Sequence, residues 1–340
     1  MTDRPAPRLL VTEPAARTGQ APVPGALPTK SGSPKAPPGR IEQVPGALPR
    51  RAEQVPGAAS LALREVLERP RTPARVVAVF PSTVYLLLKS DGDPRVIVLT
   101  GSDEARPANS VIVPSVSRSQ PFTGVREGDE AWAGDGLIEA GDFAVRVKRW
   151  WDPRPVLGPL SSARLRHSVM ALENALDPSA CGLAGHPGPA ALAEYCAAGD
   201  LARAVPAAER IVGLGPGLTP SGDDVLAGLI LSLRLLGSVL DGGGRAVWLS
   251  GWLAAAVTAD AETRTTPMGA AVLHCAAAGR PAAEAAALLR GLAGREQLLP
   301  AVRRLAKPGR AGGRDLAWGL LAGARATLAL RGETARRATA

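Results

Sequence analysis

The 340-residue chain has few cysteines and few aromatic residues, and each scarcity excludes a class of protein. Its three cysteines, Cys181, Cys196 and Cys275, lie far apart and form no Cys-x-x-Cys pair. This spacing excludes a disulfide framework and a zinc ribbon, and it predicts a protein of the reducing cytoplasm. Aromatic residues make up only 3% of the chain, which argues against a nucleic-acid domain with aromatic side chains on a basic face.

Long apolar runs are also lacking. The longest, over residues 225–240, is interrupted by Arg234 and Gly237 and is too short to span a bilayer. The first residues do not have the apolar core of a signal peptide. We therefore expect a cytoplasmic protein with no membrane partner.

The net charge of +9 is unevenly distributed, because residues 1–75 contribute +6 and the rest only +3. The first part is rich in Pro, Gly, Ala and Arg, and short near-repeats occur at 23–27, 43–47 and 54–58. Such a composition predicts a disordered tail over residues 1–72. The remainder is close to neutral, so nucleic acid is not an expected partner.

The rest of the chain changes from strand-like to helical patterns. Short apolar runs at 76–80, 84–88, 95–99, 111–113 and 143–147 are separated by turn signals and predict a β-rich domain over residues 73–155. Helical periodicity then predicts an α-helical domain over 156–332, followed by a short tail, 333–340. The expected fold class is α+β, with a small β-barrel or sandwich followed by a mainly helical domain.

Expected helices in the second domain are separated by Gly or Pro. They cover residues 160–176, 189–198, 200–212, 222–236, 245–259, 268–278, 281–293, 295–306 and 313–331. Gly237 is the expected C-cap of the helix over 222–236.

The most informative segment is Gly-Leu-Gly-Pro-Gly-Leu-Thr-Pro-Ser-Gly-Asp-Asp, residues 213–224. Glycines permit positive φ and close approach of a ligand, and unpaired N–H groups at a helix start favour anions. Ser221 suits an N-cap, with Asp224 three residues later. The alternative is a structural cap, because Asp in a first helical turn is favoured by the helix dipole alone.

Two sharper phosphate motifs do not fit this segment. No Lys follows the glycines, as a P-loop requires, and Leu218 occupies a position where the dinucleotide fingerprint has Gly. Ser221 also lacks the second glycine of a nucleophile elbow. Neighbouring carboxylates at Asp223 and Asp224 suit Mg²⁺ only together with a substrate phosphate, so the expectation is no cofactor, with Mg²⁺ as a minor alternative.

A later segment, residues 312–320, repeats this pattern. Gly222, Asp224 and Gly228 correspond to Gly313, Asp315 and Gly319. Glycine on the same helix face as the aspartate lets a second backbone approach closely. We expect two helices that cross near Gly228 and Gly319, unless the similarity is a chance result of an Ala/Gly-rich composition.

Residues 213–224 resemble the signature of a bacterial family of oxamate carbamoyltransferase subunits of the AllH type. The resemblance extends over roughly residues 70–330 and includes Thr265-Thr266 and the late segment 309–315. It implies carbamoyl transfer between phosphate and an oxamate-like acceptor (oxamate or oxalurate, with phosphate or carbamoyl phosphate) in purine or allantoin nitrogen catabolism. It also implies a hetero-oligomer with FdrA-type subunits.

The chain departs from the family's late motif, because Ala311 and Gly312 replace its two serines. Pro267, Met268 and Gly269 also stand where relatives more often have an aliphatic residue, Ser and Ala. These changes leave open a different substrate or weakened chemistry. They favour the second hypothesis, a non-catalytic or anion-sensing subunit that uses the same pocket; a purely structural protein is the third.

Candidate site residues follow from the motif and the resemblance together. Carbamoyl transfer needs positioning and charge stabilisation rather than a nucleophilic side chain. Arg264 can pair with a carboxylate or phosphate, or it lies in a solvated loop; His274 is expected as a packed helix neighbour, because no histidine has metal-ligand spacing. The catalytic candidates are Asp224, Asp223 and Ser221, and the substrate-binding candidates are Gly215, Gly217, Thr219, Gly222, Arg264, Thr265, Thr266, Gly313 and Asp315.

Overall fold

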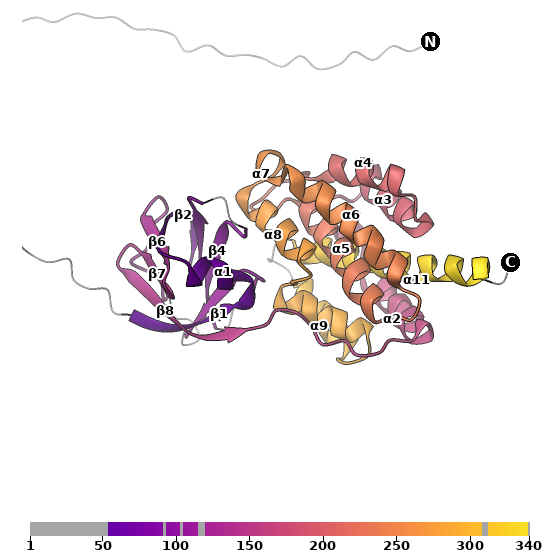
Figure 1. Cartoon of the computed structure of the whole chain (residues 1–340), viewed down its shortest axis with the longest axis horizontal. Helices are drawn as coiled ribbons and strands as arrows, with labels where there is room; N and C mark the ends of the chain where they lie inside the picture. Colours follow the sequence, from indigo (N-terminus) through magenta and orange to yellow (C-terminus); the bar gives the residue numbers. More distant parts are fainter. Residues whose placement is uncertain (1–53, 91–92, 103–104, 115–119, 308–311, 339–340) are drawn as a thin grey trace, which may run out of the picture. The chain divides into compact units, whose positions relative to one another are not determined.

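The computed structural model describes residues 54–90, 93–102, 105–114, 120–307 and 312–338 (Figure 1). They fall within one unit of the chain, residues 51–340. The tail expected over residues 1–72 lies outside the described residues as far as residue 53, as do Arg310 and Ala311 of the late motif.

The first half of the described chain forms a closed β-barrel, in the strand order β1-β5-β4-β3-β2-β6-β7-β8. Most neighbours are antiparallel, but β1 pairs parallel with β8 and β4 parallel with β5. The strands are β1 (Gln54–Ser60), β2 (Thr72–Phe80), β3 (Thr83–Leu88), β4 (Val96–Gly101), β5 (Ser110–Val113), β6 (Glu130–Gly134), β7 (Leu137–Ala140) and β8 (Phe143–Trp151).

Alternating side chains fill the barrel. In β3, Val84, Leu86 and Leu88 are fully buried, as expected for a strand with one face toward a core. Leu63 and Leu67, in the short helices η1 (Leu61–Leu63) and α1 (Arg64–Glu68), join the same core. The expected β-module is therefore present as a barrel.

The start of this module corrects the expected tail. Residues 54–72 are not part of a disordered segment, because β1 closes the barrel between β5 and β8, and η1 and α1 follow it. Ala59 and Leu63 are fully buried there. The small residues of this strand gave no strand pattern in the sequence. At Gly57 a small residue is required, because an added Cβ would be 2.5 Å from a Val145 methyl carbon.

Helices make up the second half, as expected. They are α2 (Ser162–Ala175), η2 (Pro178–Ala180), α3 (Pro187–Ala198), α4 (Leu201–Ile211), α5 (Ser221–Val239), α6 (Gly244–Ala259), α7 (Ala261–Arg264), α8 (Pro267–Ala277), α9 (Ala283–Leu292), α10 (Leu298–Leu305) and α11 (Gly313–Ala338). Among the described residues, no helix combines the length and apolar character needed to cross a membrane.

Two expected helix ends are wrong. Helix α5 continues past Gly237 to Val239, and Gly237 packs against the start of α6, where an added Cβ would be 3.1 Å from Cβ of Ala246. Helix α11 continues to Ala338, so residues 333–338 are helical rather than a tail. Gly237 resembles a helix stop signal in the sequence, but in the structure it permits close packing of α5 against α6.

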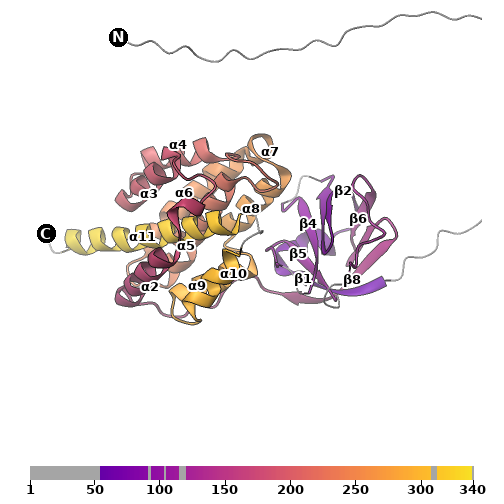
Figure 2. The same cartoon turned by 180° about the vertical axis from the view of Figure 1, so that it is seen from behind.

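The crossing of two similar helices is confirmed. Helix α11 packs along α5 (Figure 2). A Cβ added to Gly228 would lie 2.3 Å from the Leu316 carbonyl oxygen, and one added to Gly319 would lie 2.0 Å from the Val225 carbonyl oxygen. Backbone contact at this crossing places the N-termini of α5 and α11 side by side.

Barrel and helices meet through a small apolar cluster. Val96 and Val98 of β4 pack with Met268 and Ala271 of α8. The Ala283 amide also donates a hydrogen bond of 3.0 Å to the Arg106 carbonyl oxygen.

Candidate functional site

The glycine turn before α5 is held by Asp223. This carboxylate is fully buried, and its Oδ1 accepts a 2.8 Å hydrogen bond from the Gly213 amide. Its Oδ2 accepts a hydrogen bond from the Thr265 hydroxyl. Burial is the main cause that raises the pKa of Asp223, and these two donors oppose it. Asp223 therefore clamps the turn to the loop before α8, with both of its oxygens engaged.

Two further candidates, Thr266 and Arg264, complete this clamp. Thr266 is the N-cap of α8 and accepts a 3.0 Å hydrogen bond from the Gly269 amide, while its hydroxyl donates to the Leu218 carbonyl. The Arg264 guanidinium donates to the Glu209 carbonyl near the end of α4. These contacts give Thr265, Thr266 and Arg264 structural partners around the turn.

The clamp yields a stability prediction. Thr265→Val removes the hydroxyl that donates to a buried carboxylate, so we expect a loss of about 2 kcal/mol in the free energy of unfolding. Thr263→Val is the matched control, because the exposed Thr263 hydroxyl donates only to the Asp260 carbonyl. Urea unfolding measures both variants, and equal losses would contradict the clamp.

The start of α5 differs from the expected cap. Pro220 is the N-cap, and Ser221 is the first helical residue, with no side-chain capping bond. The Gly222 amide donates a 2.8 Å hydrogen bond to the Leu214 carbonyl, and the Asp223 amide donates to the Pro220 carbonyl. The expected Ser221–Asp224 capping pair is therefore wrong. The amides of Gly222 and Asp223, which an anion at the helix start would need, already donate to carbonyl groups of the chain.

Gly215 and Gly217 both adopt positive φ in this turn, at +102° and +109°. Both residues are exposed. They form the bend itself, as the glycine pattern predicted.

Asp224 differs from its neighbour Asp223. Its carboxyl is buried beside Asp315, and Oδ2 has no hydrogen-bond partner among the described residues. Burial, with the nearby Asp315 charge second, raises the pKa of Asp224 to about 8, although the Thr219 hydroxyl donates to it and opposes the shift. Asp224 is therefore mostly protonated at neutral pH and can both donate and accept a hydrogen bond.

The start of α11 repeats the arrangement of α5. A Cβ added to Gly222 would lie 1.8 Å from the Ile211 carbonyl oxygen, and one added to Gly313 would lie 2.0 Å from the Leu305 carbonyl oxygen. Each glycine thus contacts the last residue of the preceding helix, α4 or α10. The correspondence of the two segments is structural rather than a chance result of composition.

Asp315 holds a different loop. Its Oδ1 accepts a 2.7 Å hydrogen bond from the Gly182 amide. Burial and a hydrogen bond to Asp315 raise the pKa of the Cys181 thiol to about 11, so this cysteine stays protonated. Ser221 contacts the same loop, since a Cβ added to Gly182 would be 2.2 Å from the Ser221 Oγ.

A cavity of about 590 Å³ opens beside Asp224. Barrel residues, including Tyr85 and Asn109, line one part, and residues of the helical half line the rest. Of the predicted site residues, Thr219, Asp224 and Gly313 line it. Apolar walls with a few convergent polar groups are typical of a small-molecule site.

Sequence reasoning missed five polar residues that line this cavity: Thr83, Tyr85, Asn109, Arg280 and Glu284. The Arg280 guanidinium makes no hydrogen bond or ion pair with any residue in the described part of the chain. Burial raises the pKa of Tyr85, which keeps its hydroxyl protonated. Arg280 follows the end of α8 and Tyr85 is in β3, so no local motif marks either residue as a ligand contact.

The remaining candidates do not line the cavity. They are Ser221, Asp223, Gly215, Gly217, Gly222, Arg264, Thr265, Thr266 and Asp315. Both oxygens of Asp223 accept hydrogen bonds, from the Gly213 amide and the Thr265 hydroxyl. The charged or titratable oxygen and nitrogen groups of the cavity are therefore Asp224, Arg280, Tyr85 and Glu284, with Thr219 beside Asp224.

Residues 211–324, about one third of the chain, match the family model described as "Oxamate carbamoyltransferase subunit AllH". The match confirms the resemblance seen in the glycine motif. It covers both helix starts and Arg280, but not the barrel. No curated protein and no solved structure matched the chain.

Proposed function

We propose that the protein is a subunit of a carbamoyltransferase that acts on oxamate or oxalurate, with phosphate or carbamoyl phosphate as the second substrate. The observation that carries the proposal is the cavity beside Asp224. Asp224 itself lies inside the segment that matches the oxamate carbamoyltransferase subunit family. We place this reaction in the cytoplasm, in purine or allantoin nitrogen catabolism, and expect FdrA-type subunits as partners.

The groups around the cavity suit small anions that also carry an amide. Arg280 supplies a cation for a carboxylate or phosphate. A protonated Asp224 does not repel such an anion and donates a hydrogen bond to it. Thr219, which donates to Asp224, fixes the orientation of this carboxyl. The anion is therefore placed in the cavity rather than at the amides of the helix start.

In the transfer step, the acceptor amide nitrogen forms a bond to the carbamoyl carbon. The bond from that carbon to the phosphate oxygen breaks, and phosphate leaves with the electron pair. A proton leaves the nitrogen and passes to the departing phosphate, while the protonated Asp224 carboxyl donates a hydrogen bond that orients the bound anion. Arg280 stabilises the charge on the departing phosphate. Mg²⁺ is an additional candidate ligand of that phosphate.

A second candidate function is a non-catalytic or anion-sensing subunit with the same pocket. One observation favours it: Gly312 contributes no hydroxyl where the related motif has serine, and an added Cβ would lie 2.1 Å from Asp224 Oδ2. Gly312 therefore has no side chain that could donate a hydrogen bond to Asp224. Binding without turnover would distinguish this function from catalysis.

The test is ligand binding by the full chain. Thermal unfolding is followed with phosphate, carbamoyl phosphate, oxamate and oxalurate, with and without Mg²⁺. We expect carbamoyl phosphate or oxamate at about 100 times its Kd to stabilise the protein by about 2.7 kcal/mol. The Arg280→Ala variant should lose this effect, because it lacks the cavity's cation.

Arg203→Ala is the control, since Arg203 lies on α4, is 70% exposed in its side chain and does not line the cavity. Equal stabilisation of both variants would exclude the cavity as the anion site. Co-expression with FdrA-type subunits then tests turnover. Ligand binding with no transfer in that complex would favour the sensing subunit over the enzyme.

A further inference from the structure

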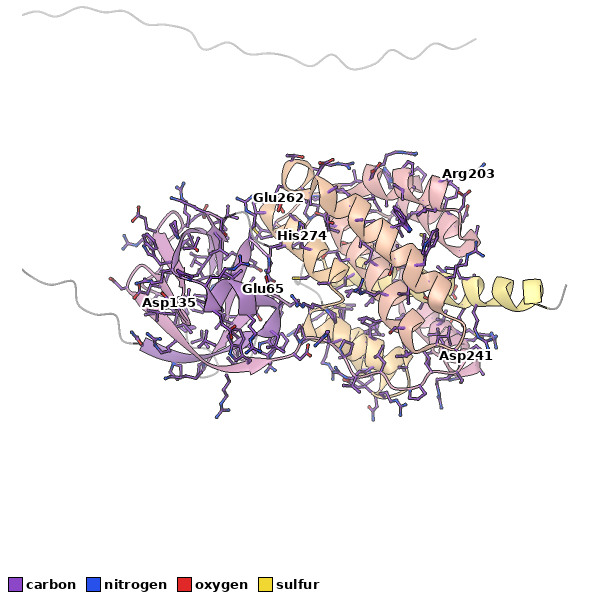
Figure 3. The ribbon with its side chains drawn as sticks, viewed as in Figure 1. Glu65, Asp135, Arg203, Asp241, Glu262 and His274 are labelled. Carbon is purple, nitrogen blue, oxygen red and sulfur yellow. The ribbon has the colours of Figure 1, made fainter. Side chains whose placement is uncertain are left out.

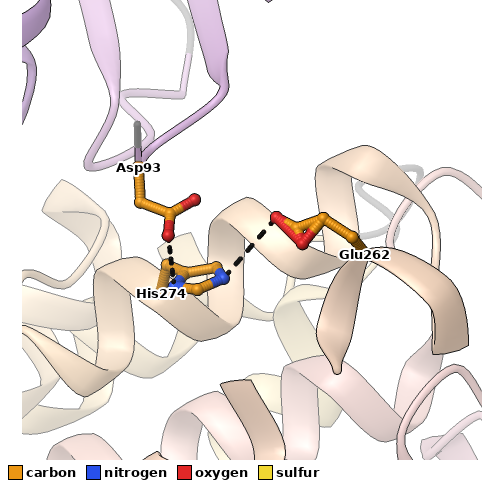
Figure 4. Close-up of side chains that lie close together, drawn as sticks. All are labelled: Asp93, Glu262 and His274. Atoms are coloured by element: carbon orange, nitrogen blue, oxygen red, sulfur yellow. Dashed lines mark ion pairs between the residues drawn. The ribbon is translucent and has the colours of Figure 1, made fainter. Parts of the chain in front are cut away.

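Three metal-ligating side chains from distant segments meet outside the cavity. Asp93 precedes β4, Glu262 is in α7 and His274 is in α8 (Figure 4). His274 Nδ1 lies 3.2 Å from Asp93 Oδ2, and His274 Nε2 lies 3.7 Å from Glu262 Oε1. One potential ligand atom from each residue lies within 4.8 Å of the other two.

The imidazole is incompletely satisfied in this cluster. Nε2 is buried and has no hydrogen-bond partner in the described part of the chain, because Glu262 is too far away to accept from it. A buried ring nitrogen without a partner is destabilising. A bound cation would satisfy this nitrogen and would also neutralise the two carboxylates around it.

We propose that Asp93, Glu262 and His274 form a site for a divalent transition-metal ion, with Zn²⁺ as the best fit. One imidazole binds an ion through one ring nitrogen, so His274 Nε2 and Glu262 would be the protein ligands, and Asp93 would accept a hydrogen bond from Nδ1. Imidazole and carboxylate ligands suit Zn²⁺, whereas Mg²⁺ and Ca²⁺ prefer oxygen ligands alone. Bonds of about 2.0–2.2 Å to a tetrahedral Zn²⁺ place two ligand atoms about 3.4 Å apart, slightly less than the 3.7 Å between His274 Nε2 and Glu262 Oε1. The side chains of Asp93 and Glu262 are 42% and 37% exposed, so modest rotations close the difference.

The local charge balance also admits a cation. Arg95 lines a small hollow of about 70 Å³ together with Asp93 and Glu262. The two carboxylates outnumber the one guanidinium in this hollow. The bound ion would link the chain before β4 to α7 and α8, and it shares no lining residue with the cavity at Asp224.

The experiment is zinc binding by the full chain without a histidine tag. Competition with a chromophoric chelator measures the affinity, and Co²⁺ absorption reports the coordination geometry. We expect one Zn²⁺ per chain and a tetrahedral Co²⁺ spectrum. His274→Gln and Glu262→Gln should each weaken binding about 10-fold or more, since each removes a ligand.

Three control variants separate this cluster from other ligands. His167→Gln changes an exposed histidine on α2, and Cys181→Ser removes the half-buried thiol. Asp241→Asn changes a carboxylate that lies far from His274 (Figure 3). All three should retain the affinity, and circular dichroism verifies folding.

Absence of stoichiometric binding, or equal binding by His274→Gln and Glu262→Gln, would overturn the proposal. Loss of binding in Cys181→Ser would also overturn it, because the site would then include that thiol. In either case the cluster acts as a polar contact between His274 and the two carboxylates. Carbamoyl phosphate binding is unaffected by these outcomes, so the proposed function is tested separately.

Discussion

Gly319→Ala is expected to destabilise the protein by about 3 kcal/mol, the upper part of the range for overpacking. The new Cβ would lie 2.0 Å from the Val225 carbonyl oxygen, 2.8 Å from the Val225 carbonyl carbon and 3.0 Å from the Leu229 amide nitrogen. All three atoms belong to the α5 backbone, so no side chain can rotate away. The two helices must separate, and the intrinsic gain of about 1 kcal/mol from alanine in a helix is smaller than this cost.

Gly251→Ala is the matched control for this substitution. Gly251 is also inside a helix, α6, but no atom lies within 4 Å of the added Cβ. There the same change should stabilise the protein by about 0.5–1 kcal/mol. Urea unfolding of the two variants gives the comparison, and similar effects would contradict backbone contact between α5 and α11.

The helix crossing shows how much of the fold the sequence could predict. Gly222, Asp224 and Gly228 align with Gly313, Asp315 and Gly319, and this spacing was sufficient to pair two helices far apart in the chain. Strand β1 was missed for the opposite reason. Its Gln-Val-Pro-Gly-Ala segment has no alternating large apolar residues, and only pairing with β5 and β8 makes it a strand.

The site was predicted less well than the fold. The glycine motif located Asp224 and Thr219, but it grouped them with Asp223, whose oxygens hold the turn. Adjacent aspartates in a helix point about 100° apart, and the sequence does not say which one faces a cavity. Arg280 and the Asp93–Glu262–His274 cluster depend on contacts between the barrel and the helices. Local spacing carries no information about such contacts.

Asp224→Asn should change the pH dependence of stability. The pKa of Asp224 is raised from 3.8 to about 8 in the folded protein. Between these values the folded state retains a proton that the unfolded state has lost, so raising the pH favours unfolding. This group's contribution is fully present below about pH 4 and is lost as the pH rises toward 8. The wild type should therefore lose about 1.4 kcal/mol per pH unit from Asp224 in this window.

Asn cannot ionise, so the variant should lack this component of the slope. Between pH 5 and pH 7 its free energy of unfolding should rise relative to the wild type by about 3 kcal/mol. Asp241→Asn is the control, since the Asp241 side chain is 98% exposed, and its curve should run parallel to that of the wild type. A parallel curve for Asp224→Asn would mean that Asp224 is ionised at neutral pH, and the cavity would then repel an anion instead of donating a hydrogen bond to it. A variant whose free energy of unfolding falls relative to the wild type between pH 5 and pH 7 would have the same meaning, because the predicted change is a rise until the folded-state pKa is reached.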